Sequence, residues 1–204
     1  EKLAREAVVK AGGKIVDENG EERFLIPVAA PVPSALEQCW EPGPIAGSRF
    51  TPEEMERITA VTDIVRAVKQ FAPGWKITNC GPDMDPGLRP ELRGKKNVLL
   101  THPQSRTVPC ALSREASIPA GVKTRLVLEV GHHEEGDWEL VVKADGVTLF
   151  QGTIGKDTAK NGWRTVAVDL SAYAGKTVRL ELLNQANGWA WEAGYWASIA
   201  LVSE

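Results

Sequence analysis

The stretch 187–196, NGWAWEAGYW, holds three of the chain's seven tryptophans and one of its two tyrosines. A tryptophan offers a flat apolar face on which the C–H face of a sugar ring can stack. Carboxylate, amide and imidazole groups bind the hydroxyls of the same sugar. This stretch and its neighbours supply both kinds of group, and two adjacent histidines earlier in the chain could form another wall. The candidate ligand-binding residues are Asn184, Asn187, Trp189, Trp191, Glu192, His132 and His133.

The same tryptophans also have a structural interpretation. Trp189 and Trp191 share one parity with Ile199, so a strand that extended back to them would place all three in a core. If the chain instead turns at Gly194, the earlier pair leaves the sheet and becomes a loop platform. For Trp196 we favour the core, because a late tryptophan commonly closes the end of a sandwich.

The sequence carries no signature of catalysis or of a transition-metal site. It has no G-x-S-x-G elbow, no H-E-x-x-H, no phosphate-binding glycine loop and no dinucleotide fingerprint, so we expect no enzyme. His132 and His133 adjoin acidic residues, but neighbours on a strand point to opposite faces and bind one ion poorly together. A structural calcium is better matched to the acidic loop at Asp83 and Asp85, since calcium takes oxygen ligands. No other cofactor is expected.

Charge and hydropathy exclude two classes of partner. The 24 basic and 27 acidic residues are interspersed and give a formal net charge of −3. No broad basic face is therefore available to neutralise nucleic-acid phosphates. No apolar run approaches the roughly 20 residues that cross a bilayer, so no membrane span is expected.

The first 74 residues form an N-terminal segment of mixed character. Helical spacing predicts a short helix over 1–11, and the turn signal Glu18-Asn19-Gly20 predicts a hairpin over 14–28. Six prolines over 27–52 indicate a wrapped arm or linker. A capping box at Thr51 begins a predicted helix over 52–71. Its predicted packing stripe consists of Met55, Ile58, Thr62, Val65, Val68 and Ala72.

Over residues 75–204 the spacing of apolar residues changes from the helical pattern of three and four to every second residue. Eight short segments rich in β-branched residues are separated by turn signals, which predicts an antiparallel β-sandwich or jelly roll. In 124–132 and 177–183, alternate residues are apolar, so each strand should have one buried face and one face exposed to solvent. The predicted strands are 97–102, 111–119, 124–133, 137–145, 147–154, 163–170, 176–184 and 195–202. The fold class is therefore mainly β, preceded by an α-helical and proline-rich segment.

The three cysteines, Cys39, Cys80 and Cys110, lack any C-x-x-C spacing. One disulfide with one cysteine left over is one possibility. Cys80 and Cys110 are then the favoured pair, because each sits beside a proline in a loop flanking a predicted strand. Three reduced thiols are the alternative.

The region 75–204 resembles a galactose-binding-like β-sandwich, in particular the novel putative carbohydrate-binding modules found beside glycoside hydrolases. The resemblance rests on Gly94 and on His102 with Ser105 in GKKNVLLTHPQSRTVPCALS, on the hairpin from Val142 to Phe150, and on WA at 196–197 at the start of the last strand. It implies a non-catalytic domain of an exported bacterial protein, extracellular or periplasmic, which often carries a calcium ion. The pair His132-His133 and the segment NGWAWEAG depart from the family pattern.

Two functions arise as hypotheses. The first is a carbohydrate-binding module that uses the aromatic loop to keep an exported polypeptide near a polysaccharide or glycan. The alternative is a structural or protein-interaction sandwich without sugar affinity, in which the N-terminal arm and helix contact other domains of the same polypeptide.

Overall fold

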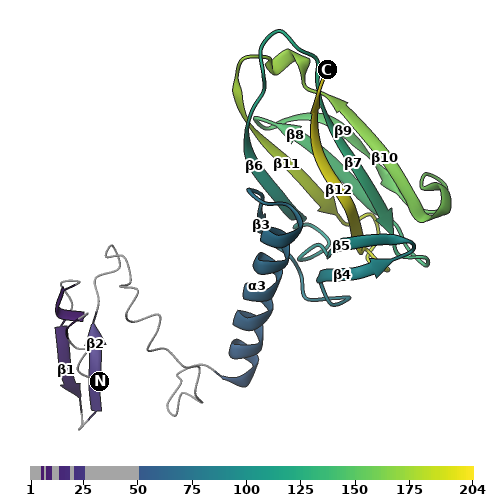
Figure 1. Cartoon of the computed structure of the whole chain (residues 1–204). Coiled ribbons are helices and arrows are strands. Elements are labelled where there is room, and N and C mark those ends of the chain that lie inside the picture. The colour runs from purple at the N-terminus through teal and green to yellow at the C-terminus, as the bar shows by residue number, and fades with distance from the viewer. Residues whose placement is uncertain (1–5, 7, 11–13, 19–20, 26–50) are drawn as a thin grey trace. The chain divides into compact units, whose positions relative to one another are not determined.

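The structure is a computed structural model that describes residues 6, 8–10, 14–18, 21–25 and 51–204 (Figure 1). The chain divides into two compact units, residues 1–51 and 52–204. In the first unit, β1 (Lys14–Glu18) and β2 (Glu21–Leu25) pair antiparallel, as the hairpin prediction requires, and residues 6 and 8–10 are helical. Residues 26–50 lie outside the described residues; they include Cys39 and nearly all of the predicted proline-rich arm.

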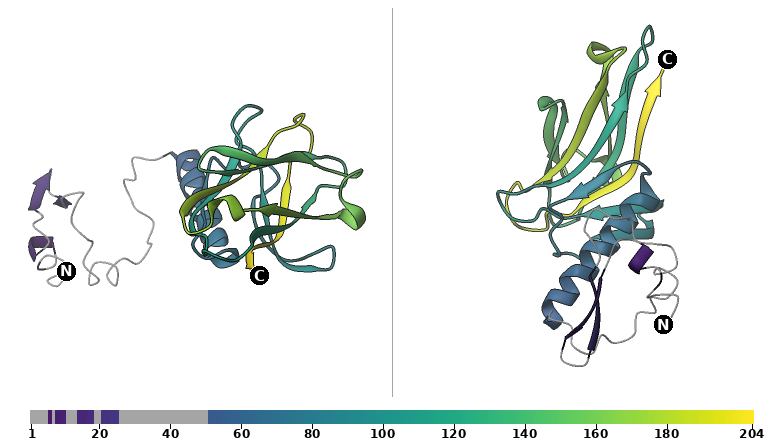
Figure 2. Two further views of the ribbon diagram at one scale, coloured as in Figure 1. Left: turned by 90° about the horizontal axis from the view of Figure 1, so that it is seen from above. Right: turned by 90° about the vertical axis from the view of Figure 1, so that its left-hand side faces the viewer.

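The second unit contains an antiparallel β-sandwich of two five-stranded sheets, which confirms the predicted fold class (Figure 2). The first sheet has the order β10-β7-β12-β5-β4, and the second has the order β3-β6-β11-β8-β9. Most connections pass from one sheet to the other, as in a jelly roll. The strands are β3 (Lys76–Thr78), β4 (Gly87–Leu92), β5 (Lys95–Thr101), β6 (Cys110–Ser117), β7 (Thr124–His132), β8 (Trp138–Ala144), β9 (Val147–Ile154), β10 (Trp163–Asp169), β11 (Thr177–Gln185) and β12 (Gly194–Ser203). Two short 3-10 helices, η1 (Lys160–Gly162) and η2 (Ser171–Tyr173), flank β10.

The core lies between the two sheets and agrees with the predicted alternation. The inward residues of β7 and β11 are all buried: Leu126, Leu128, Val130, Val178, Leu180 and Leu182. Trp138 and Trp196 are fully buried, with ring centroids 5.3 Å apart. Each buried indole N–H has an acceptor, the carbonyl oxygen of Gly131 for Trp138 and the hydroxyl of Thr101 for Trp196, both at 2.9 Å. Both tryptophans are therefore core residues, as expected for Trp196.

The helix α3 (Pro52–Phe71) has the predicted bounds, but its buried face agrees with the predicted stripe only in part: Val68 and Ala72 are buried as predicted. It packs against β3, β4 and β5 through a face that includes Ile64, Ala67 and Val68. Ile58 and Val65, predicted to pack, are exposed. Only the C-terminal half of α3 meets the sandwich, and its contacts with β3, β4 and β5 select a face rotated from the one that periodicity alone suggests (Figure 1).

Two short strands, β3 and β4, were not predicted. Strand β4 reads GLRPEL, and Pro90 argues against a strand by its sequence alone. The structure accommodates it because β4 is an edge strand and Pro90 is skipped in the ladder to β5, whose pairs run from Gly87 with Leu100 to Leu92 with Lys95. A proline at an edge leaves no ladder hydrogen bond unmade.

The strand register gathers four connections at one end of the sandwich. Gly194, the first residue of β12, pairs with the last residues of both β5 and β7, which are Thr101 and His132. The start of β10 also pairs with the end of β7, and the start of β8 pairs with the ends of β9 and β11. The segments 102–109, 133–137, 155–162 and 186–193 therefore lie together, and we call this the loop end.

Candidate functional site

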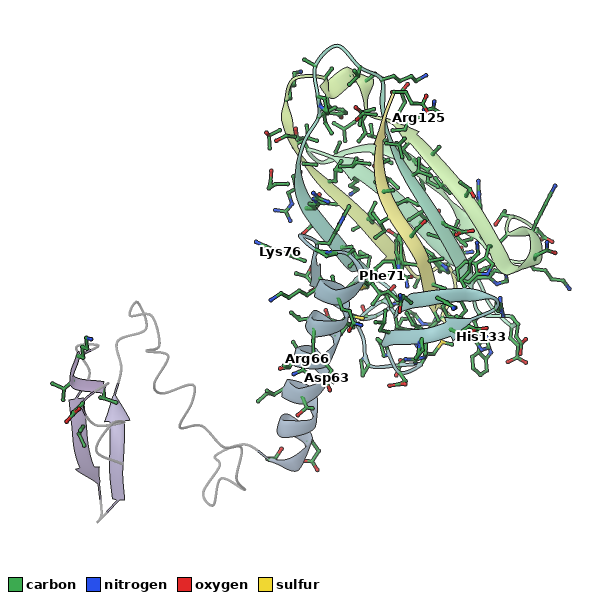
Figure 3. The ribbon with its side chains drawn as sticks, in the orientation of Figure 1. Asp63, Arg66, Phe71, Lys76, Arg125 and His133 are labelled. Carbon is green, nitrogen blue, oxygen red and sulfur yellow. The ribbon has the colours of Figure 1, made fainter. Side chains whose placement is uncertain are left out.

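Trp191 and His133 form an aromatic stack at the surface of the loop end. Their ring centroids are 4.6 Å apart and their planes differ by only 9°. Trp191 is 47% exposed, the only tryptophan among the large exposed apolar residues of the described chain. His133 comes from the β7–β8 connection, at the lower right of the sandwich in Figure 3. Two connections far apart in sequence thus contribute one ring each to a stack, and we call this pair of rings the platform.

The backbone beneath the platform adopts a conformation that favours glycine. Trp189 has φ +140° and Trp191 has φ +62°. Each such residue costs on the order of 1–3 kcal/mol and persists only when its surroundings hold it in place. Strain of this kind gathers at functional sites.

Glu192 holds the loop from below. Its side chain is 1% exposed and accepts hydrogen bonds from the backbone N–H of Asn187 at 2.9 Å and of Gly188 at 2.6 Å. A buried carboxylate needs such partners, and charge-assisted bonds of this kind are the strong ones. The structure therefore places Glu192 in a supporting position, out of reach of a ligand on the surface.

Asn184 also lies beneath the surface. It is fully buried, and its amide nitrogen donates to the carbonyl and hydroxyl oxygens of Thr101 and to the carbonyl oxygen of Glu192, at 3.1–3.3 Å. These bonds tie the end of β11 to the end of β5 and to the aromatic loop. The position suggests support for the loop and excludes direct contact with a bulky ligand.

The two remaining loop residues have different surroundings. Asn187 is exposed, and its amide nitrogen donates to Asp137 at 3.0 Å, which joins the aromatic loop to the β7–β8 connection. Trp189 is half-buried and meets the buried ring of His102 edge-on, at 5.4 Å and 76°. Trp189 therefore lies partly beneath the loop, whereas Trp191 stands on its surface.

Gly136 explains why the two connections fit so closely. A Cβ atom at this position would lie 2.5–2.6 Å from Ala190 and Trp191, closer than any real contact allows. Only glycine permits the β7–β8 connection to pass this near the aromatic loop. Sequence reasoning did not identify Gly136, and it considered Asp137 only as an acidic neighbour of the double histidine.

His132 lies away from the platform. It is buried, and its Nδ1 donates to the carbonyl oxygens of His133 at 2.5 Å and Gly136 at 2.8 Å. His133, by contrast, accepts at Nδ1 from the backbone N–H of Glu135 at 3.2 Å. The two rings thus have different partners and serve different surfaces, and only His133 belongs to the platform.

The predicted calcium site has little support from its named residues. Asp83 and Asp85 are both exposed, and the carboxylate of Asp85 pairs with Arg89 at 2.9 Å. In the part of the chain that the structure describes, no three His, Cys, Asp or Glu side chains come together as metal ligands would. Calcium also takes backbone and amide oxygens as ligands, so a calcium ion stays a prediction.

Cys80 and Cys110 are free thiols that contact one another. The disulfide favoured by sequence position is not formed. The hydrogen bond from Cys110 lowers the pKa of Cys80, although burial opposes this. The same bond, together with burial, raises the pKa of Cys110 well above its ordinary value.

We therefore expect Cys80 to react first with iodoacetamide at neutral pH, because it has the larger thiolate fraction and the greater exposure. Peptide mapping by mass spectrometry of the briefly treated chain measures this. Equal labelling of Cys80 and Cys110 in the native chain would contradict it, and labelling of the unfolded chain is the control.

No family model matches the chain, and its sequence matches no curated protein. Solved structures similar to it include an apo cyclase from Fischerella sp., with a TM-score of 0.47 and 14% identity over 66% of this chain and 84% of that one. A CBM22-1 xylan-binding domain from Paenibacillus barcinonensis has a TM-score of 0.44 and 13% identity, over 65% and 87%. An adhesin domain of Lys-gingipain from Porphyromonas gingivalis has 0.47 and 16%, over 64% and 91%. Carbohydrate-binding modules are thus among the similar β-sandwich structures, but TM-scores below 0.5 assign the chain neither a family nor an activity. In the described residues, no helix is long and apolar enough to span a membrane.

Proposed function

We propose that this chain is a non-catalytic module that binds a carbohydrate on the platform of Trp191 and His133. The observation that carries the proposal is the nearly parallel stack of the two rings at the surface of a strained loop. An aromatic side chain that only filled a core would be buried, as Trp196 is. An exposed flat ring offers apolar area at little entropic cost, which suits the C–H face of a sugar.

Polar groups around the platform suit the hydroxyls of such a ligand. Asn187 and Asp137 form a hydrogen-bonded pair beside the aromatic loop, and each has further bonding capacity. Glu134 and Glu135 follow His133 directly and are exposed. An amide and several carboxylates bordering an apolar face are the usual composition of a sugar site.

The proposal includes no catalytic step. Glu192, the acidic residue next to Trp191, is buried and already accepts two backbone hydrogen bonds, so it is not placed to transfer a proton to a substrate. The role we propose is to keep an exported, extracellular or periplasmic polypeptide close to its glycan.

A glycan-array screen tests the proposal, with the intact chain, its Trp191→Ala variant and a Val147→Ala control. Val147 is exposed in the hairpin at the opposite end of the sandwich. We expect the intact chain and the control to bind a common set of glycans, and Trp191→Ala to lose them at least tenfold, since removing a stacking aromatic anchor typically costs about 2 kcal/mol or more.

Two results would count against the proposal. Glycan binding that survives in Trp191→Ala would locate the sugar elsewhere. If the folded chain binds no glycan on a broad array, with or without calcium, the alternative of an interaction domain without sugar affinity is favoured.

A further inference from the structure

A basic hollow adjoins the platform on the other side of the β7–β8 connection. It has a volume of about 440 Å³ and opens to solvent between that connection, the β4–β5 turn and the segment 155–162. Its polar lining comprises Arg93, His132, Glu134, Lys156, Lys160 and Asn161. His132 and Glu134 flank His133 in sequence, so one short connection contributes to both surfaces.

The hollow gathers positive charge in a chain whose net charge is −3. Arg93, Lys156 and Lys160 face a single carboxylate, that of Glu134. None of the three cations forms an ion pair with another described residue, whereas Lys95, Lys123 and Arg125 elsewhere on the sandwich each have a carboxylate partner. Unpaired cations around one concave surface are an electrostatic match for an anion.

Arg93 is held in place by its neighbours. Its Nη1 donates to the carbonyl oxygen of His132 at 3.0 Å, and its guanidinium lies 5.8 Å from the centre of the Tyr195 ring. A Cβ atom on Gly162 would approach Nη1 to 2.8 Å, so the glycine leaves room for the guanidinium. The carbonyl oxygen of Arg93 accepts from the indole of Trp163 at 3.3 Å. The remaining N–H groups form a fixed fork suited to a carboxylate or a sulfate.

His132 contributes a different kind of contact. Its Nδ1 carries the proton, because both of its partners are carbonyl oxygens. The other ring nitrogen, Nε2, has no hydrogen-bond partner among the described residues of this chain. In the neutral ring that atom accepts a hydrogen bond, and a sugar hydroxyl beside an acidic group could donate it.

We propose that the hollow binds the anionic group of an acidic saccharide, either a uronate carboxylate or a sulfate ester. The inference rests on the proposed function, since the platform would hold a sugar ring while Arg93, Lys156 and Lys160 bind the acidic group. It adds to that function the class of glycan that the chain selects. The charge pattern also explains how an acidic protein can prefer an acidic ligand.

Isothermal titration with three oligosaccharides of equal length tests this: one neutral, one containing uronate and one sulfated. The variant is Lys156→Ala/Lys160→Ala, which removes two exposed side chains. The matched control is Lys143→Ala/Lys176→Ala, which removes the same charge at the opposite end of the sandwich. We expect the variant to bind an acidic oligosaccharide about tenfold or more weakly than the intact chain does, with neutral binding unchanged. The control should retain both, and added salt should weaken only the acidic affinity.

The outcomes separate this inference from the proposed function. An acidic affinity that is equal in the intact chain and in Lys156→Ala/Lys160→Ala, or lost equally in the control, would overturn the inference. If Trp191→Ala nevertheless loses all saccharide binding, the proposed function of the platform is still supported. Conversely, acidic binding that survives Trp191→Ala but not the lysine variant would support the hollow and refute the platform. Which acidic oligosaccharide binds distinguishes a uronate from a sulfate ester.

Discussion

Replacing Trp196 with Ala should destabilise the sandwich by about 3–5 kcal/mol, the range for large aromatic truncations in a core. Its ring is fully buried against Trp138, so the change leaves a cavity between the two sheets. The substitution also removes the donor to the hydroxyl of Thr101. Because Thr101 in turn accepts from Asn184, the loss extends to the base of the aromatic loop.

Urea denaturation followed by circular dichroism measures this effect. Trp191→Ala is the matched comparison, since it removes the same type of side chain from a nearby position that is exposed. That variant should lose no more than about 1 kcal/mol, the worth of an aromatic pair at an exposed site. Equal losses in the two variants would contradict the assignment of one tryptophan to the core and the other to a platform.

Glu192→Gln should weaken glycan binding although Glu192 touches no ligand. Each carboxylate oxygen accepts one backbone N–H, from Asn187 and from Gly188. Glutamine has a single acceptor oxygen, so its NH2 group must face one of these N–H donors. An unsatisfied buried donor costs about 1–3 kcal/mol, and somewhat more when a charged acceptor is lost. The strained loop beneath Trp191 would then lose the bonds that hold it.

Hydrogen exchange tests the physical basis of this prediction, the loosening of the loop, without a known ligand. The amides of Asn187 and Gly188 should exchange faster in Glu192→Gln than in the intact chain, while core amides change less. Glu115→Gln, an exposed change on β6, is the control. Unchanged exchange at both loop amides would show that Glu192 does not hold the loop.

The fold was predictable because most strands have one buried face and one face exposed to solvent. In β7 and β11 the alternation of apolar and polar residues identifies the inward side directly, and all eight predicted strands are present. The edge strand β4 was not predicted, because a tertiary position decides whether Pro90 is tolerated. The face of α3 that packs was predicted only in part for a similar reason, since contacts with β3, β4 and β5 select it.

Alternation along the last strand predicted the burial of the site's aromatic residues only in part. Parity alone placed Trp189 and Trp191 with Ile199, but the strand begins only at Gly194, and a bulge between Trp196 and Ser198 changes the parity of the later residues. Trp196 and Ile199 consequently face the main core, whereas Tyr195 joins a second apolar cluster. A bulge of this kind has no strong signal in a single sequence.

The basic hollow could not be predicted at all. Arg93 lies far from Lys156 and Lys160 along the chain, and only the meeting of the β4–β5 turn with the segment 155–162 brings them together. The stack of His133 on Trp191 is another such long-range contact, although both residues were named as candidates. Residue types indicated which groups could bind a ligand, and the loop end determined which of them meet.

The most direct test of the central claim is a titration followed by the indole N–H resonances in a two-dimensional 1H–15N NMR spectrum, using the glycan selected by the array. The Trp191 resonance should shift most, Trp189 less, and the buried Trp138 and Trp196 hardly at all, because a sugar on the platform contacts only the first of these rings. A Trp191 resonance that stays fixed while the glycan saturates the chain would show that the sugar binds elsewhere and that the platform is not its site.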